Sequence, residues 1–177
     1  MRAALTLFLV TAAACDGASV SEVESKVATI EHWRFEIPLE WKRTDAKRDD
    51  VLQSVWSPLA NERKESIAVV RSKRSDGGNF PGEPALGDLL RTAQNGLRQR
   101  RVSSLTPVST AHGLVGARLD ATFVPEGLSR SYRRTHVVLM DRSHPDELIH
   151  VLYTAADPDP ASTALDLVLS TLTAKEG

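Results

Sequence analysis

Alternating apolar and polar residues predict β-structure from Val27 onward. In the run TIEHWRFEIP, Trp33, Phe35 and Ile37 fall on one side of an extended chain, and the residues between them are polar. A period of two is typical of a strand with one buried face. We therefore expect the folded domain to begin at Val27 with a half-buried strand.

Two more extended runs precede a change to helical spacing. VLQSVWSPL places Val51, Val55 and Trp56 before Pro58, and ESIAVVRSK is rich in β-branched residues, so both predict strands. The glycine- and proline-rich SDGGNFPGEP predicts a loop. From residue 86 to about 101, leucine and alanine recur every three or four positions, and arginines gather at the end. This pattern predicts an amphipathic helix with a basic last turn.

The second half of the chain repeats the order of strands followed by a helix. Extended patterns cover about 103–110 and the runs GLVGARLDATFV, SRSYRRTHVVLM and ELIHVLYTA, with DRSHPD as a hairpin loop between the last two. After them, a terminal helix is predicted with Asp159 as its N-cap and Pro160 in its first turn.

These elements predict an α+β fold, a mostly antiparallel sheet of about six or seven strands with helices packed on both faces. Hairpin-linked strands between single helices favour an antiparallel sheet. The segments VVLM and IHVLY are apolar at consecutive positions. That pattern indicates strands buried on both faces, and hence a helix on each side of the sheet.

The N-terminus has a different pattern. Residues 3–14 are uncharged and follow Arg2. The stretch is too short for a helix across a hydrocarbon core of ~30 Å, but it suits the apolar region of a signal peptide. The single cysteine, Cys15, comes next and polar residues follow it.

Ala12-Ala13-Ala14-Cys15 resembles a bacterial lipobox, in which the cysteine is acylated and becomes the new N-terminus after cleavage. The leucine that usually lies three residues before the cysteine is an alanine here. We expect a lipoprotein signal peptide at 1–14, a lipid on Cys15 and a flexible tether over 15–26. Ordinary cleavage before a free Cys15 thiol is the alternative.

This arrangement predicts a protein of the bacterial cell envelope, anchored to a membrane through Cys15 and facing the periplasm. Asp16 follows the cysteine, and in lipoproteins of enterobacterial type this is associated with retention in the inner membrane. The rule varies between lineages, so the choice between inner and outer membrane stays open.

Composition and motifs exclude several classes of function. With 22 basic and 23 acidic residues the net charge is −1, which removes the simplest electrostatic case for a nucleic-acid partner. One cysteine excludes a disulfide framework and a multi-cysteine metal site. The chain has no G-x-S-x-G, H-E-x-x-H, P-loop or G-x-G-x-x-G motif. We therefore expect no catalytic residues, no cofactor and no enzyme.

Two side-chain groups remain as candidates. A hairpin turning at Ser143–His144 would make His136 and His150 diagonal neighbours on one face, but no spacing predicts the third ligand that zinc needs. We expect ordinary sheet histidines and no metal. Arginine is favoured at protein interfaces and at anionic groups, and the candidate partner-binding residues are Arg98, Arg100, Arg101, Arg130, Arg133 and Arg134. A solvated, charge-balanced face is the alternative for these arginines.

The chain as a whole resembles the PsbP-like superfamily, which also holds the bacterial DcrB lipoproteins and the Ran-binding Mog proteins. The resemblance spans roughly 27–175. It rests on FEIPLEW, the helical segment after residue 86, GLVGARLDATF, the strand ending in HVLYTA and the terminal helix. It implies an α/β/α sandwich around an antiparallel sheet, without a shared catalytic centre, in proteins that bind other proteins.

Together these features predict a non-catalytic, monomeric envelope lipoprotein whose domain binds another protein near the membrane surface. The alternative is a carrier or chaperone that holds an apolar helix or a lipid in a groove between sheet and helix. A large apolar pocket would favour this alternative.

Overall fold

The computed structural model describes residues 24–48, 51–60, 64–73, 101–103, 105–125, 127–144, 146–156 and 162–174. The predicted signal peptide, Cys15 and most of the predicted tether lie outside the described residues. So do Arg98, Arg100 and nearly all of the helix predicted from residue 86. Within the described segments, no helix is long and apolar enough to cross a membrane.

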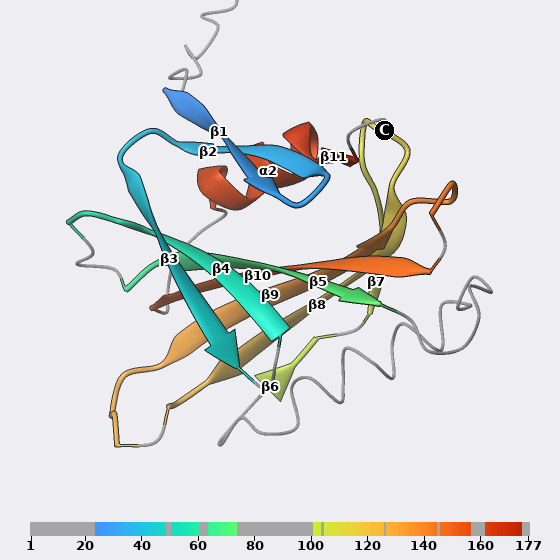
Figure 1. Cartoon of the computed structure of the whole chain (residues 1–177). Helices are drawn as coiled ribbons and strands as arrows, with labels where there is room; N and C mark the ends of the chain where they lie inside the picture. Colours follow the sequence, from blue (N-terminus) through green and yellow to red (C-terminus); the bar gives the residue numbers. More distant parts are fainter. Residues whose placement is uncertain are drawn as a thin grey trace, which may run out of the picture.

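A large antiparallel sheet forms the centre of the protein (Figure 1). Its strand order is β3-β4-β5-β10-β9-β8-β6, and β7 also pairs with β8. The bounds are β3 Trp41–Arg48, β4 Val51–Pro58, β5 Ser66–Lys73, β6 Arg101–Val102, β7 Thr106–Ser109, β8 Val115–Phe123, β9 Tyr132–Met140 and β10 Glu147–Ala156. The predicted antiparallel sheet is therefore confirmed, with more strands than expected.

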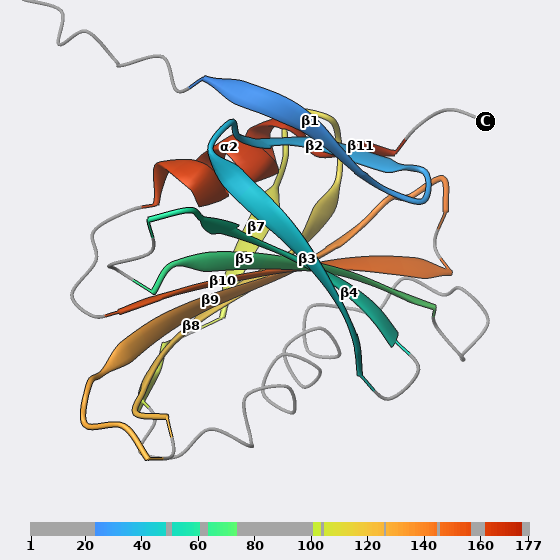
Figure 2. The ribbon, with the colours of Figure 1, turned by 60° about the vertical axis from the view of Figure 1, so that its left-hand side comes forward.

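A small sheet and a helix cover one face of the large sheet, which we call the covered face (Figures 1 and 2). The small sheet consists of β1 (Ser25–Ile30), β2 (Trp33–Pro38) and β11 (Thr173–Ala174) in the order β1-β2-β11. The helix, α2, runs over Thr163–Thr171. The opposite face of the large sheet is called the far face.

The first predicted strand is in fact a hairpin. β1 and β2 pair from Ile30↔Trp33 outward around a turn at Glu31 and His32, and Glu31 has a positive φ of 53°. The first described strand begins at Ser25, two residues before the predicted boundary. β3 was not predicted, because its sequence WKRTDAKR is mostly charged. It lies at one edge of the large sheet, where apolar alternation is not required.

The main core lies between the covered face and the layer formed by α2 and the small sheet. Trp33, Phe35 and Ile37 are fully buried in it, which confirms the alternation in their strand. Phe35 meets Trp56 of β4 edge-to-face, with ring centroids 5.2 Å apart. From the other side, α2 contributes Leu165 and other apolar residues.

A second apolar cluster lies on the far face. It consists of Ala117, Leu119, Val138, Met140 and Leu148. Val138 and Met140 alternate with Val137 and Leu139, which belong to the main core, so β9 is buried on both faces as predicted. Helices on both faces are not seen in the described part of the chain, where the one helix, α2, lies on the covered face.

The terminal helix starts later than predicted. Its N-cap is Ser162, whose Oγ accepts a hydrogen bond of 3.1 Å from the backbone N–H of Leu165. The prediction of Asp159 as N-cap was wrong, because the extended backbone and hydroxyl of Ser162 supply the cap one turn further along. The helix ends at Thr171, and the chain returns to an extended conformation in β11.

Candidate functional site

The predicted arginine cluster is divided between two faces of the large sheet. Arg101 of β6 and Arg133 of β9 are both cross-strand partners of Thr122, so their side chains lie on the same face. Arg133 also pairs with Ala155, a residue of the main core, which identifies this as the covered face. Arg101 is the first residue of a strand and not the end of a helix.

Arg118 joins this group, although the sequence analysis missed it. Its Nε and Nη2 donate to the two carboxylate oxygens of Asp120, each over 3.1 Å. Arg133 Nη2 lies 3.5 Å from the same carboxylate, and Thr135 donates its hydroxyl to it. The alternation of Arg118, Asp120 and Thr122 along β8 was the signal that could have shown a polar face.

The charge state of Asp120 follows from these contacts. Burial would raise its pKa, but hydrogen bonds from Arg118 and Thr135 and the charges of Arg118 and Arg133 hold the pKa below its ordinary value. Asp120 is therefore an anion at neutral pH. We call Arg101, Arg118 and Arg133 the arginine stripe.

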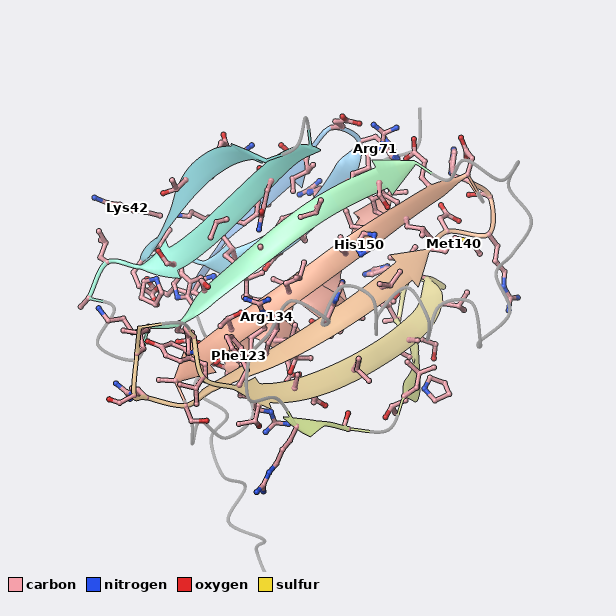
Figure 3. All side chains as sticks on the ribbon, turned by 90° about the horizontal axis from the view of Figure 1, so that it is seen from below. Lys42, Arg71, Phe123, Arg134, Met140 and His150 are labelled. Carbon is pink, nitrogen blue, oxygen red and sulfur yellow. The ribbon has the colours of Figure 1, made fainter. Side chains whose placement is uncertain are left out.

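Arg134 belongs to the far face and not to the stripe (Figure 3). Its guanidinium carbon lies 5.0 Å from the centroid of the Phe123 ring, and its Nε donates to Thr154 Oγ1 over 3.1 Å. Burial lowers the pKa of Arg134. These contacts indicate a packing role. Arg130 lies exposed between β8 and β9.

His136 and His150 are diagonal neighbours on the far face, as predicted. The Nε2 atom of His136 lies 3.1 Å from Nδ1 of His150, and the Nε2 atom of His150 lies 2.8 Å from Ser72 Oγ. Burial lowers the pKa of His136 to about 3, aided by His150 and Arg134, and lowers the pKa of His150 to about 4. Both rings are neutral at neutral pH.

The direction of this hydrogen-bond chain bears on its chemistry. Nδ1 of His136 is buried without a partner. A buried N–H without an acceptor is rarer than an unfilled acceptor, so the proton belongs on Nε2 of His136. His136 then donates to His150, and His150 donates to Ser72. In this direction the imidazole does not take a proton from the Ser72 hydroxyl, as a nucleophilic serine would require.

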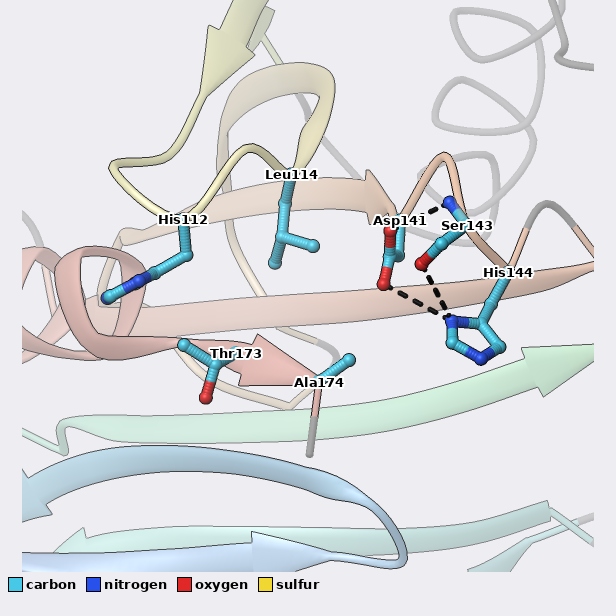
Figure 4. Close-up of a pocket in the computed structure, with 7 residues that line it drawn as sticks. All are labelled: His112, Leu114, Asp141, Ser143, His144, Thr173 and Ala174. Carbon is cyan, nitrogen blue, oxygen red and sulfur yellow. Dashed lines mark hydrogen bonds and ion pairs between the residues drawn. The ribbon is translucent and has the colours of Figure 1, made fainter. Parts of the chain in front are cut away.

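A polar cavity of about 280 Å³ opens at the β9–β10 end of the molecule (Figure 4). It is lined by His112, Leu114, Asp141, Ser143, His144, Thr173 and Ala174. Nδ1 of His144 lies 3.0 Å from Ser143 Oγ and 3.3 Å from Asp141 Oδ2. Burial would raise the pKa of Asp141, but hydrogen bonds from Ser143 and His144 hold it below its ordinary value. The walls suit a small polar molecule better than an acyl chain.

Beside this cavity, an ion-pair network joins the small sheet to the large one. Arg71 of β5 bonds to both Glu31 and Glu147, and His32 Nε2 lies 3.1 Å from Glu147 Oε2. The network fixes the β1–β2 turn against β5 and β10. Its ion pair to Glu31 helps to stabilise the positive φ of that residue. Nowhere in the described segments do three histidine, cysteine or acidic side chains converge so that they could hold a metal ion.

Comparison with known proteins supports the fold. No family model matches the chain, and no curated protein matches it. The solution structure of cyanobacterial PsbP (CyanoP) from Synechocystis sp. PCC 6803 is similar, with a TM-score of 0.59 and 20% identity over 92% of this chain and 98% of that one. PA94, a Pseudomonas aeruginosa protein of unknown function, has a TM-score of 0.48 and 18% identity over 76% of this chain and 85% of its own, which is too weak to assign a fold. On the similarity to CyanoP, this chain has a PsbP-like fold.

Proposed function

We propose that this protein is a non-catalytic lipoprotein of the bacterial cell envelope whose PsbP-like domain binds another protein near the membrane surface. The observation that carries the proposal is the position of Cys15, which follows a signal-like segment and precedes the first strand at Ser25 by ten residues. An extended segment of this length reaches roughly 35 Å. It would keep the domain close to the membrane without fixing its orientation.

The chemistry of the described residues supports a binding role over catalysis. Asp120 and Asp141 are held by hydrogen bonds within the fold, and the His136–His150–Ser72 chain runs in a direction that does not activate the hydroxyl. The resemblance to the PsbP-like superfamily implies protein binding as well.

We further propose that a helix also packs on the far face, as the sequence predicts. The covered face is occupied by α2 and the small sheet, whereas Leu119, Val138 and Met140 form a buried cluster on the far face. The apolar stripe predicted after residue 86 suits that cluster.

Intact mass and detergent-phase partitioning of the natively expressed protein test the membrane anchor, with Cys15→Ala as the matched variant. We expect a mature mass that begins at Cys15 and includes acyl chains, and we expect Cys15→Ala to fold normally but to leave the detergent phase. A mature chain without lipid would refute the anchor.

Crosslinking in intact cells tests the binding role. A protein that crosslinks to the anchored domain at one mapped surface, and not to an unfolded variant, would support it. Lipid that co-purifies stoichiometrically with Cys15→Ala would contradict it and support the carrier function instead. Native mass spectrometry distinguishes the two, because bound lipid adds a defined mass.

A further inference from the structure

The arginine stripe brings three guanidinium groups together on neighbouring strands. Arg101, Arg118 and Arg133 come from β6, β8 and β9 on the covered face. They lie where this face is open to solvent, because Arg101 is exposed and the side chains of Arg118 and Arg133 are 32% and 40% exposed. Because paired strands lie about 4.8 Å apart, the backbones of Arg101 and Arg133 are separated by about 10 Å, with Thr122 between them. The two side chains can thus reach two separate anionic groups.

Within the described segments, the stripe carries more positive charge than the acidic residues beside it neutralise. Asp120 is the acidic residue that pairs with Arg118 and Arg133, and Arg101 has no ion pair among the described residues. Among the described residues, the three arginines of the stripe and the one carboxylate of Asp120 carry a net charge of +2. A bound anion would reduce the repulsion among these guanidinium groups, which favours binding of an acidic ligand.

Asp120 also holds Arg118 in a fixed position before any ligand binds. Its carboxylate holds Nε and Nη2 of Arg118 and accepts a hydrogen bond from Thr135, and its backbone N–H donates to Ser103 Oγ over 3.0 Å. Nη1 of Arg118 makes none of these bonds and remains a donor. A guanidinium that is already held in place loses less conformational entropy when it binds a ligand.

We propose that the arginine stripe binds an acidic segment of a partner protein, with separate carboxylates taken by Arg101 and Arg133 on either side of Thr122. Acidic residues two or three positions apart in an extended peptide are roughly 7–10 Å apart, which matches this spacing. A single phosphate group would engage one end of the stripe. The proposal rests on the protein-binding function and names the chemistry of the partner.

Fluorescence anisotropy with a labelled peptide of alternating glutamate and serine tests the stripe. The mature protein is used in a neutral detergent at low salt, and the probe is compared with its glutamine counterpart. We expect the acidic peptide to bind and the glutamine peptide not to bind. Arg101→Gln and Arg133→Gln should each lower the affinity for the acidic peptide at least about fivefold. Arg34→Gln removes an exposed arginine of the small sheet as a matched control and should leave the affinity unchanged.

Asp120→Asn tests whether the peptide is bound by arginines that Asp120 holds in place, or merely by attraction to positive charge. The substitution makes the protein more positive, so attraction by net charge alone predicts tighter binding. If Asp120 instead orients the arginines for binding, the substitution should weaken binding, because an amide cannot accept both hydrogen bonds from the Arg118 guanidinium. Arg118→Lys keeps the charge but loses the same hydrogen bonds, and it provides the test if Asp120→Asn does not fold. We expect weaker binding from it as well.

Three results would overturn the proposal. They are equal binding of the acidic and glutamine peptides, no effect of Arg101→Gln and Arg133→Gln, and tighter binding by Asp120→Asn. Stripe-dependent binding to phosphatidylglycerol vesicles without peptide binding would replace the protein partner with a lipid surface. The crosslinks and membrane partitioning described above are measured independently of these substitutions. If they persist while the peptide fails to bind, the stripe is refuted and the protein-binding function stands.

Discussion

Replacing His136 and His150 together by leucine should remove most of the loss of folding stability on going from neutral to mildly acidic pH. The two rings lie on the apolar far face, and their pKa values are lowered to about 3 and about 4. In the unfolded chain both pKa values return to about 6.5. Between these limits the unfolded state binds more protons than the native state, so stability is full above pH 6.5 and falls as the pH is lowered.

The size of the effect follows from these values. At pH 5 each histidine disfavours the native state by about 2 kcal/mol, so the pair costs about 4 kcal/mol relative to pH 7.5. Near pH 5 the slope of the unfolding free energy approaches roughly 3 kcal/mol per pH unit, because nearly two protons are taken up on unfolding. This is a large part of the 5–15 kcal/mol typical of a folded domain.

Urea unfolding of the Cys15→Ala form at pH 7.5, 6.5, 5.5 and 5.0 measures this dependence. The difference between wild type and the double leucine variant should grow by about 4 kcal/mol in favour of the variant as the pH falls from 7.5 to 5.0. His112→Leu, in an exposed turn, controls for the loss of a histidine as such. If the unfolding free energy of the double variant has the same pH dependence as that of the wild type, the two histidines do not have strongly lowered pKa values. The reasoning from their burial is then wrong.

Two other substitutions test the packing. Gly116→Ala should destabilise the domain by several kcal/mol or prevent folding, because a Cβ at Gly116 would lie 1.8 Å from the carbonyl oxygen of Val138; a melting temperature equal to that of wild type would contradict the close approach. Ser162→Ala should cost about 1 kcal/mol by removing the cap of α2. Ser170→Ala removes an exposed hydroxyl near the other end of the same helix and should change thermal stability less, and equal losses would argue against the cap.

Strand burial was the most predictable property of this fold. Trp33, Phe35 and Ile37 alternate with polar residues and are all buried, while the continuous apolar run in β9 is buried on both faces. Both patterns arise from the two-residue repeat of an extended chain, which is a local property. β3 escaped prediction because a sheet-edge strand needs no apolar alternation. β1 was merged with β2 into one predicted strand because the turn at Glu31 lacks the glycine or asparagine that usually marks a hairpin.

The candidate site was only partly predictable for a related reason. Arg133 and Arg134 are neighbours in sequence but point to opposite faces, so grouping arginines by sequence alone placed them together wrongly. Arg118 was missed because its membership in the stripe depends on the pairing of β8 with β9 and β6. The diagonal contact of His136 with His150 could be predicted because a short hairpin sets the register between its two strands.

The sequence by itself therefore determined which faces of the strands are apolar, and it alone carries the lipobox-like segment at Cys15, which depends on no tertiary contact. The tertiary structure decided which polar groups meet. It placed Arg118 and Arg133 at Asp120, with Arg101 on the same face, and buried two neutral histidines side by side. Strand order and register between distant segments arise from how whole faces pack together, and no local period of the chain encodes them.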